Sequence, residues 1–220
     1  DWSSDVCSSD LGATYNQPCS SPNVGFWSML TRGNEGAMEA TKGILVCCTN
    51  GTIQVRVVGR GNFQNGQPLR RFALEQIDRG AKQCTIDLGG CEGMDSTFLG
   101  VLAGIALRLR TSADDRPVRV DNVSPRNLDL LQTLGLDRLF TIEAAGTPAP
   151  ADAKFERLPD SDLAHVPKQL NKNDTADLML EAHDNLIRAD TRNLAKFKDL
   201  TSFLRDRLDK SGAESTPTKP

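Results

Sequence analysis

The sequence lacks the features that several common protein classes require. Its 26 basic and 29 acidic side chains nearly balance and are interspersed, so it offers no basic surface for nucleic acid. No window approaches the roughly 20 apolar residues of a membrane-spanning helix. We therefore expect a soluble, cytoplasmic protein that binds no nucleic acid and has no membrane span.

The motifs of common enzymes are also absent. There is no GxSxG nucleophile elbow, and the two histidines, His165 and His183, have no Ser or Cys motif beside them. His183 lies near Asp177 and Asp184 in sequence, but no second His or Cys stands at ligand spacing, which favours a histidine on a solvated helix face. The six cysteines show no CxxC spacing and indicate reduced structural thiols. We expect no catalytic residue, no metal and no cofactor.

One stretch, residues 84–109, combines a strand pattern, glycines and a helix pattern. Residues 84–88 alternate apolar with polar, which predicts a short strand, and the glycines after them permit a sharp exit. Asp95 and Ser96 follow, where a side-chain oxygen can accept from the free amides of a first helical turn. An apolar stripe then predicts a helix that lies flat on a sheet: Leu99, Val101, Leu102, Ile105, Ala106 and Leu109. Ser96 is expected at an exposed, positively polarised helix end.

These residues resemble the STAS superfamily, in particular the bacterial anti-sigma factor antagonists. The family signature is an Asp-Leu strand end, a short loop, then Met-Asp-Ser-Ser-Gly-Leu-Gly and an apolar helix. This chain has Asp87 and Leu88, then Met94, Asp95, Ser96, Thr97, Phe98, Leu99 and Gly100, with Phe98 where the family has glycine. A second similarity over residues 125–140 extends the resemblance to about residues 43–145. It implies an α/β fold in which a mixed β-sheet is packed with helices.

The resemblance also implies a function. Ser96 matches the serine that a partner kinase phosphorylates, and Asp95 matches the acidic residue before it. The unphosphorylated domain would sequester an anti-sigma factor that is also a serine kinase, and phosphorylation would reverse this. ATP would be bound by the partner, because this chain has neither GxGxxG nor GxxxxGK[ST]. The expected partner-binding residues are Asn62, Phe63, Asp95, Ser96, Thr97 and Phe98. A scaffold in a signalling or transport-associated complex, without a phospho-switch, is the alternative.

The rest of the domain is predicted from turn and helix signals. Asn50 and Gly51 separate two β-branched runs, which predicts a hairpin of strands 44–48 and 52–58. Residues 59–67 are predicted as a loop, with Pro68 beginning a helix that ends at Gly80. A strand at 117–120, a helix from Ser124 to Gly135 and a last strand near 139–142 follow. We expect the strand at 84–88 to pair in parallel with the strand at 117–120.

The two ends of the chain call for separate interpretations. Residues 1–11 look like the translation of a sequencing adapter, and residues 12–42 are interpreted as a disordered or non-native leader, with Met38 as the native initiator. Residues 146–172 read as a linker, and residues 211–220 as a disordered tail. Between them, residues 173–210 are predicted to form one long amphipathic helix. That helix either folds back on its own domain, self-associates or docks a different protein.

Overall fold

The structure is a computed structural model that describes residues 42–110, 117–143, 153–159 and 172–213. The interpretations of residues 1–11 and of nearly all of 12–42, and His165, lie outside the described residues. The elements in chain order are β1 (Gly43–Thr49), β2 (Thr52–Gly61), α1 (Phe63–Asp78), β3 (Gln83–Met94), α2 (Ser96–Leu109), β4 (Val118–Asp121), α3 (Pro125–Thr133), η1 (Leu136–Arg138), β5 (Thr141–Glu143), β6 (Glu156–Arg157), α4 (Lys172–Ala189), η2 (Thr191–Asn193) and α5 (Leu194–Ala213).

The six strands form one mixed sheet in the order β5-β4-β3-β2-β1-β6. The pairs β2/β3, β3/β4 and β4/β5 are parallel, and the pairs β1/β2 and β1/β6 are antiparallel. The β1–β2 turn places Asn50 and Gly51 at φ 53° and 72°, as a two-residue hairpin of the I′ type requires. The mixed sheet, the hairpin and the parallel β3/β4 pair confirm the sequence predictions.

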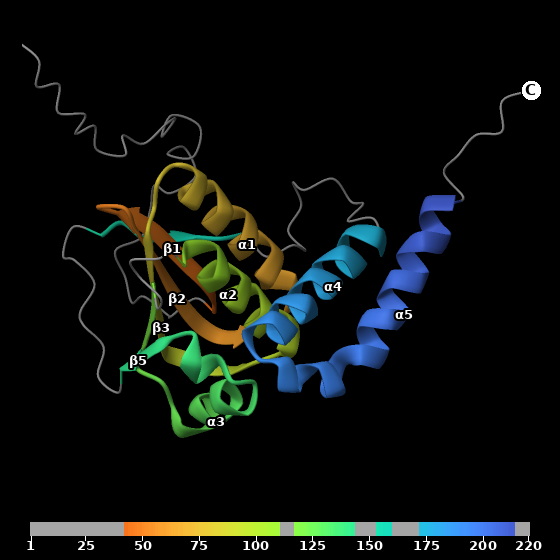
Figure 1. Cartoon of the computed structure of the whole chain (residues 1–220). Helices are drawn as coiled ribbons and strands as arrows, with labels where there is room; N and C mark the ends of the chain where they lie inside the picture. The colour runs from red at the N-terminus through yellow and green to blue at the C-terminus, as the bar shows by residue number, and fades with distance from the viewer. Residues whose placement is uncertain (1–41, 111–116, 144–152, 160–171, 214–220) are drawn as a thin grey trace, which may run out of the picture. The chain divides into compact units, whose positions relative to one another are not determined.

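Helices α1 and α2 contact each other and pack on one face of the sheet (Figure 1). Along β2 and β3, buried residues alternate with half-exposed ones, because successive side chains point to opposite faces. The buried set is aliphatic, and it includes Ile53, Val55, Val57, Ile86 and Leu88. The core therefore lies between the sheet and these two helices.

Two predicted boundaries are wrong. Helix α1 begins at Phe63 rather than at Pro68, which lies inside the helix. The side chain of Asn62 accepts from the backbone N–H groups of Gln64 and Asn65, and the Asn65 side chain accepts from the Asn62 N–H. This reciprocal cap is an amide version of the capping box and starts the helix early. Strand β3 continues to Met94, because its glycines keep pairing with β2 across two register shifts.

The predicted linker contains a strand. Residues Glu156 and Arg157 form β6, which pairs with β1, and the backbone N–H of Leu158 donates to the Ile44 carbonyl at 2.8 Å. The Phe155 ring lies 4.7 Å from the guanidinium carbon of Arg56. The part of the segment that the structure describes therefore belongs to the sheet. Its polar sequence is typical of a two-residue strand at a sheet edge.

The C-terminal segment forms two helices, not the one predicted. Helix α4 ends at Ala189, and Asp190 takes an extended conformation with φ −148° and accepts from the N–H of Arg192. The amide nitrogen of Asn193 donates to the carbonyls of Leu134 and Leu186, both at 2.9 Å. The chain turns here because Asp190 caps the next helix and buried Asn193 ties the turn to the end of α3. The pair α4–α5, residues 172–213, is called the C-terminal helix pair below.

Candidate functional site

Asp95 joins the beginnings of α1 and α2. It follows β3 directly, and its N–H donates to the Gly61 carbonyl at the end of β2 at 3.0 Å. Its Oδ1 accepts from the N–H of Phe98 at 2.8 Å, and its Oδ2 accepts from the N–H of Phe63 at 3.0 Å. One carboxylate therefore satisfies free amides of two helices, and its charge suits the positive ends of both helix dipoles.

Ser96 is the first residue of α2, and its side chain meets α4. Its Oγ lies 3.0 Å from Nε2 of His183, and the serine is half-buried. His183 is 2% exposed, its Nδ1 lies 2.6 Å from the Met179 carbonyl, and its ring packs edge-on against Phe197 with centroids 4.8 Å apart. The expected open hydroxyl is thus partly covered by the chain's own C-terminal helix pair.

The protonation of this contact follows from its partners. A carbonyl oxygen only accepts, so the Nδ1 of His183 must carry the hydrogen in that bond. In the neutral ring Nε2 is then an acceptor, and the Ser96 hydroxyl donates to it.

The structure brings together four of the six residues expected to bind a partner. Asn62 and Phe63 at the start of α1 lie beside Asp95 and Ser96 at the start of α2, and Phe63 is 39% exposed. The other two need correction as surface residues: Thr97 is 3% exposed and Phe98 is 0% exposed. The Phe98 ring packs over Gly61, where a Cβ would meet it, so its bulk fills the core rather than facing a partner.

Sequence reasoning missed His183, which was expected on a solvated helix face. One signal could have found it. Helix α2 is apolar around nearly its whole circumference, and a helix of that kind is covered on both sides. Ten of its residues are buried, although the sheet can cover only one side. A second helix had to lie on α2, and the small residues Ser96, Gly100 and Gly104 mark the side on which it could approach.

A polar cluster surrounds Asp87, in the first half of β3, on the face of the sheet opposite α1 and α2. Burial raises the pKa of Asp87, but its bonds from the Asn122 amide at 2.9 Å, the Gly89 N–H at 3.0 Å and the Arg56 Nε at 3.1 Å outweigh it, so the pKa is lowered. Asp87 is therefore ionised at neutral pH and holds the start of the glycine-rich segment.

Three of the described thiols, those of Cys47, Cys84 and Cys91, are buried. Burial raises the pKa of Cys47 and Cys91, and it raises that of Cys84 to about 12. The thiols of Cys47, Cys84 and Cys91 form no disulfide. Nowhere in the described ranges do three or more His, Cys, Asp or Glu side chains gather so as to hold a metal ion. None of the described helices has the length and apolarity needed to cross a bilayer.

The comparisons with known proteins address the family. Residues 48–142 match the family model described as Mlab, STAS domain. Similar solved structures include SpoIIAA, an anti-sigma factor antagonist, in its unphosphorylated form, with 21% identity over 47% of this chain and 87% of that one and a TM-score of 0.39. The Bacillus cell fate determinant SpoIIAA in its phosphorylated form has 22% identity over 44% and 87%, and a TM-score of 0.38. A Thermotoga maritima protein provisionally assigned as an anti-sigma factor antagonist has 17% identity over 44% and 83%, and a TM-score of 0.40.

No curated protein sequence matches the chain. The family match spans the elements from the end of β1 to β5 and includes Asp95 and Ser96. Residues 48–142 of this chain, less than half of its 220 residues, are therefore similar to a STAS domain.

Proposed function

We propose that this STAS domain is an anti-sigma factor antagonist of the bacterial cytoplasm. In this proposal the domain is a non-enzymatic binding module that sequesters an anti-sigma factor, itself a serine kinase that supplies the ATP. Phosphorylation at Ser96 switches the module off. The observation that carries the proposal is the position of the Ser96 hydroxyl, in the first turn of α2 beside exposed Phe63.

A phosphate at this position is compatible with the fold. It adds about −1.5 to −2 charges, and the amides of a helix N-terminus favour an anion by roughly 0.3–1 kcal/mol. A partner whose interface covers Ser96 would bind the phosphorylated chain more weakly, because an unpaired phosphate would lose its water in the interface. Each loss of about 1.4 kcal/mol weakens binding tenfold, so the modification can switch an interface while the domain stays folded.

Binding is a better account of this site than catalysis. Ser96 and His183 have the spacing of a nucleophile and its base. The cavity of about 220 Å³ between α1, α2 and α4, however, is lined by neither of them. It is lined by Arg70, Leu74, Val101, Gly104, Ile105, Leu107, Arg108, Leu178, Glu181, Ala182, Asn185 and Arg188. A substrate held in that cavity would not meet the serine.

The switch is tested by phosphorylation and partner capture with matched variants. We expect phosphate on Ser96 of the wild-type chain, seen by intact-mass and peptide analysis of protein from its native cells, and none on Ser96→Ala. Ser96→Ala should capture the anti-sigma factor, whereas Ser96→Asp should lose it. Ser202→Asp places the same charge on an exposed serine of α5 and should bind like wild type. Equal capture by all four chains would refute the switch.

A scaffold function is the second candidate, and α5 favours it. Leu194, Leu200 and Phe203 are 53%, 38% and 61% exposed, which is unusual for large apolar side chains that lie on one helix. They suit assembly with other chains. An oligomer that persists in Ser96→Asp but is lost in Phe203→Asp would support this function over the phospho-switch.

A further inference from the structure

The approach of α4 to α2 is close enough to bring the two helix backbones together. A Cβ at Gly100 would collide with the backbone carbonyl of Ala182, and a Cβ at Gly104 would collide with the side-chain amide of Asn185. Ser96, Gly100 and Gly104 are spaced four residues apart and so share one side of α2. The serine that the proposed partner must reach therefore lies on the surface that α4 covers (Figure 1).

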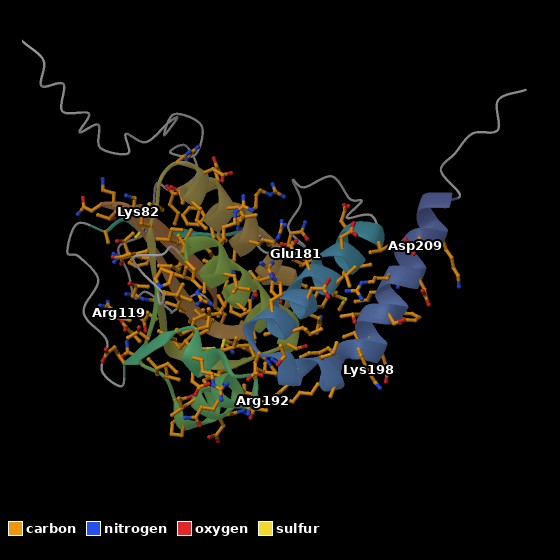
Figure 2. All side chains as sticks on the ribbon, viewed as in Figure 1. Lys82, Arg119, Glu181, Arg192, Lys198 and Asp209 are labelled. Atoms are coloured by element: carbon orange, nitrogen blue, oxygen red, sulfur yellow. The ribbon has the colours of Figure 1, made fainter. Side chains whose placement is uncertain are left out.

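The buried face of α4 completes this contact with apolar side chains. Leu178 is 5% exposed, Ala182 1% and Leu186 0%, and both leucines belong to the main hydrophobic core. At the rim, the guanidinium of Arg70 on α1 pairs with the carboxylate of Glu181 at 2.5 Å (Figure 2, where Glu181 is labelled). Both partners of that pair are well exposed, so it adds little to the docking energy. The apolar contact and the Ser96–His183 bond carry the docking.

The contact depends on the chemical state of the serine. The Ser96 Oγ lies 3.0 Å from Nε2 of His183, which is 2% exposed, so the space around the hydroxyl is already filled by the ring. A phosphate on this oxygen would add a bulky group where the ring now lies. It would also bring about −1.5 to −2 charges next to a nearly dry helix contact, where burying a charge is costly.

We propose that the C-terminal helix pair is an intramolecular ligand of the Ser96 surface. Bare Ser96 holds α4 in place through His183, and the docked helix competes with the partner for the same surface of α2. Phosphorylation of Ser96 releases α4 but leaves a phosphate on that surface, and the partner of the proposed function does not bind the phosphorylated serine. This inference rests on the proposed function for its choice of Ser96. It adds that the chain's own helix α4 already contacts Ser96, so a partner must displace α4 before it reaches Gly100 and Gly104.

The test uses a thiol that is reachable only when α4 leaves. Leu186→Cys places a cysteine in the buried face of α4, and Leu69→Cys places one in the equally buried face of α1 toward the sheet. Iodoacetamide is added to the full chain, and peptide masses give the alkylation rate at each position. Each reporter is combined with serine, Ser96→Ala or a genetically encoded phosphoserine at position 96. Ala182→Arg serves as a forced release, and Ala195→Arg on the exposed side of α5 is its matched control.

Phosphoserine and Ala182→Arg should each raise alkylation at position 186 by at least about tenfold, because the rate follows the populated open fraction. Ala195→Arg and all rates at position 69 should stay unchanged. Three results would overturn the proposal: no response to phosphoserine, no response to Ala182→Arg, or a parallel rise at position 69 that indicates global unfolding. Partner capture by Ser96→Ala and Ser96→Asp is measured separately, so a chain that switches its partner without exposing position 186 would refute only the release of α4.

Discussion

Helices α4 and α5 have similar amphipathic sequences but different surroundings. On α4, Ala182 and Leu186 are buried against α2, with 1% and 0% exposure. On α5, Leu204 is 3% exposed, whereas Leu200 and Phe203 are 38% and 61% exposed. The reason is the number of neighbours, because α4 lies between α2 and α5, and α5 packs mainly on α4 (Figure 1). The same periodicity therefore produces a core helix in one case and a partly uncovered surface helix in the other.

The largest effect that separates the two helices is the loss of a buried side chain. Leu186→Ala should lower the free energy of unfolding by about 2–5 kcal/mol, because it removes a fully buried leucine and leaves a cavity. Phe203→Ala removes a larger side chain but should change stability by no more than about 0.5 kcal/mol, since that ring is mostly in water. Urea denaturation followed by circular dichroism measures both. Equal losses would mean that α5 is as deeply packed as α4 in solution.

A smaller effect concerns the backbone contact between α2 and α4. Gly100→Ala puts a methyl group against the backbone of Ala182, which cannot move aside, and overpacking of this kind costs about 1–3 kcal/mol. Gly104→Ala is the matched control, because it gains the same roughly 1 kcal/mol of helix propensity but meets only the amide end of Asn185. We expect Gly100→Ala to be less stable than Gly104→Ala in urea denaturation. The reverse order would show that the helices pack less closely.

The Ser96–His183 bond should have a measurable coupling energy. A double-mutant cycle with Ser96→Ala, His183→Ala and the double variant should give about 0.5–1.5 kcal/mol, the usual net value of one buried hydrogen bond. The packing of the imidazole on Phe197 cancels in the cycle, so the coupling reports the bond itself. The cycle applied to Thr201 and His183 is the control, because the Thr201 hydroxyl donates to the Lys198 carbonyl at 3.1 Å. A coupling energy near zero would show that the Ser96–His183 bond does not help to hold α4 on α2.

The fold of residues 43–143 was predictable because its signals are local. Asn50 and Gly51 need a left-handed turn, and Ser124 followed by Pro125 is a helix start that the structure contains. The Asp95 cap also follows from sequence, since its carboxylate accepts from the N–H three residues on. Asn62 was harder to identify, because an asparagine pair replaces the usual Ser and Glu of a capping box.

The arrangement of the C-terminal helix pair was not predictable from local pattern. The turn at Asp190 depends on Asn193, whose side-chain amide donates to the Leu134 carbonyl 59 residues away. The local sequence of the helix does not indicate that acceptor. His183 has the same difficulty, because its bond to Ser96 spans 87 residues. Tertiary contacts of this length override helix propensity, which on its own extends one helix through residues 173–210.

The smallest expected effect lies at the boundary between α4 and α5. Hydrogen bonds from the Arg192 side chain and N–H, with the charges of Arg192 and Arg138, lower the pKa of Asp190 to about 2. A carboxyl with a lowered folded pKa stabilises the fold fully above its ordinary value near 3.8, and the contribution is lost as the pH falls toward 2.

Asp190→Asn keeps a side chain that can cap η2 but removes the charge. The wild-type chain should therefore melt at a higher temperature than Asp190→Asn near pH 5. This difference should shrink as the pH falls from roughly 5 to roughly 2. Because both arginines are mostly exposed, with 64% and 66% of their side-chain surface in water, added salt should reduce the difference as well. A difference that is constant with pH would assign the turn to the buried Asn193 amide alone, and α4 would then end where it does for reasons of hydrogen bonding without charge.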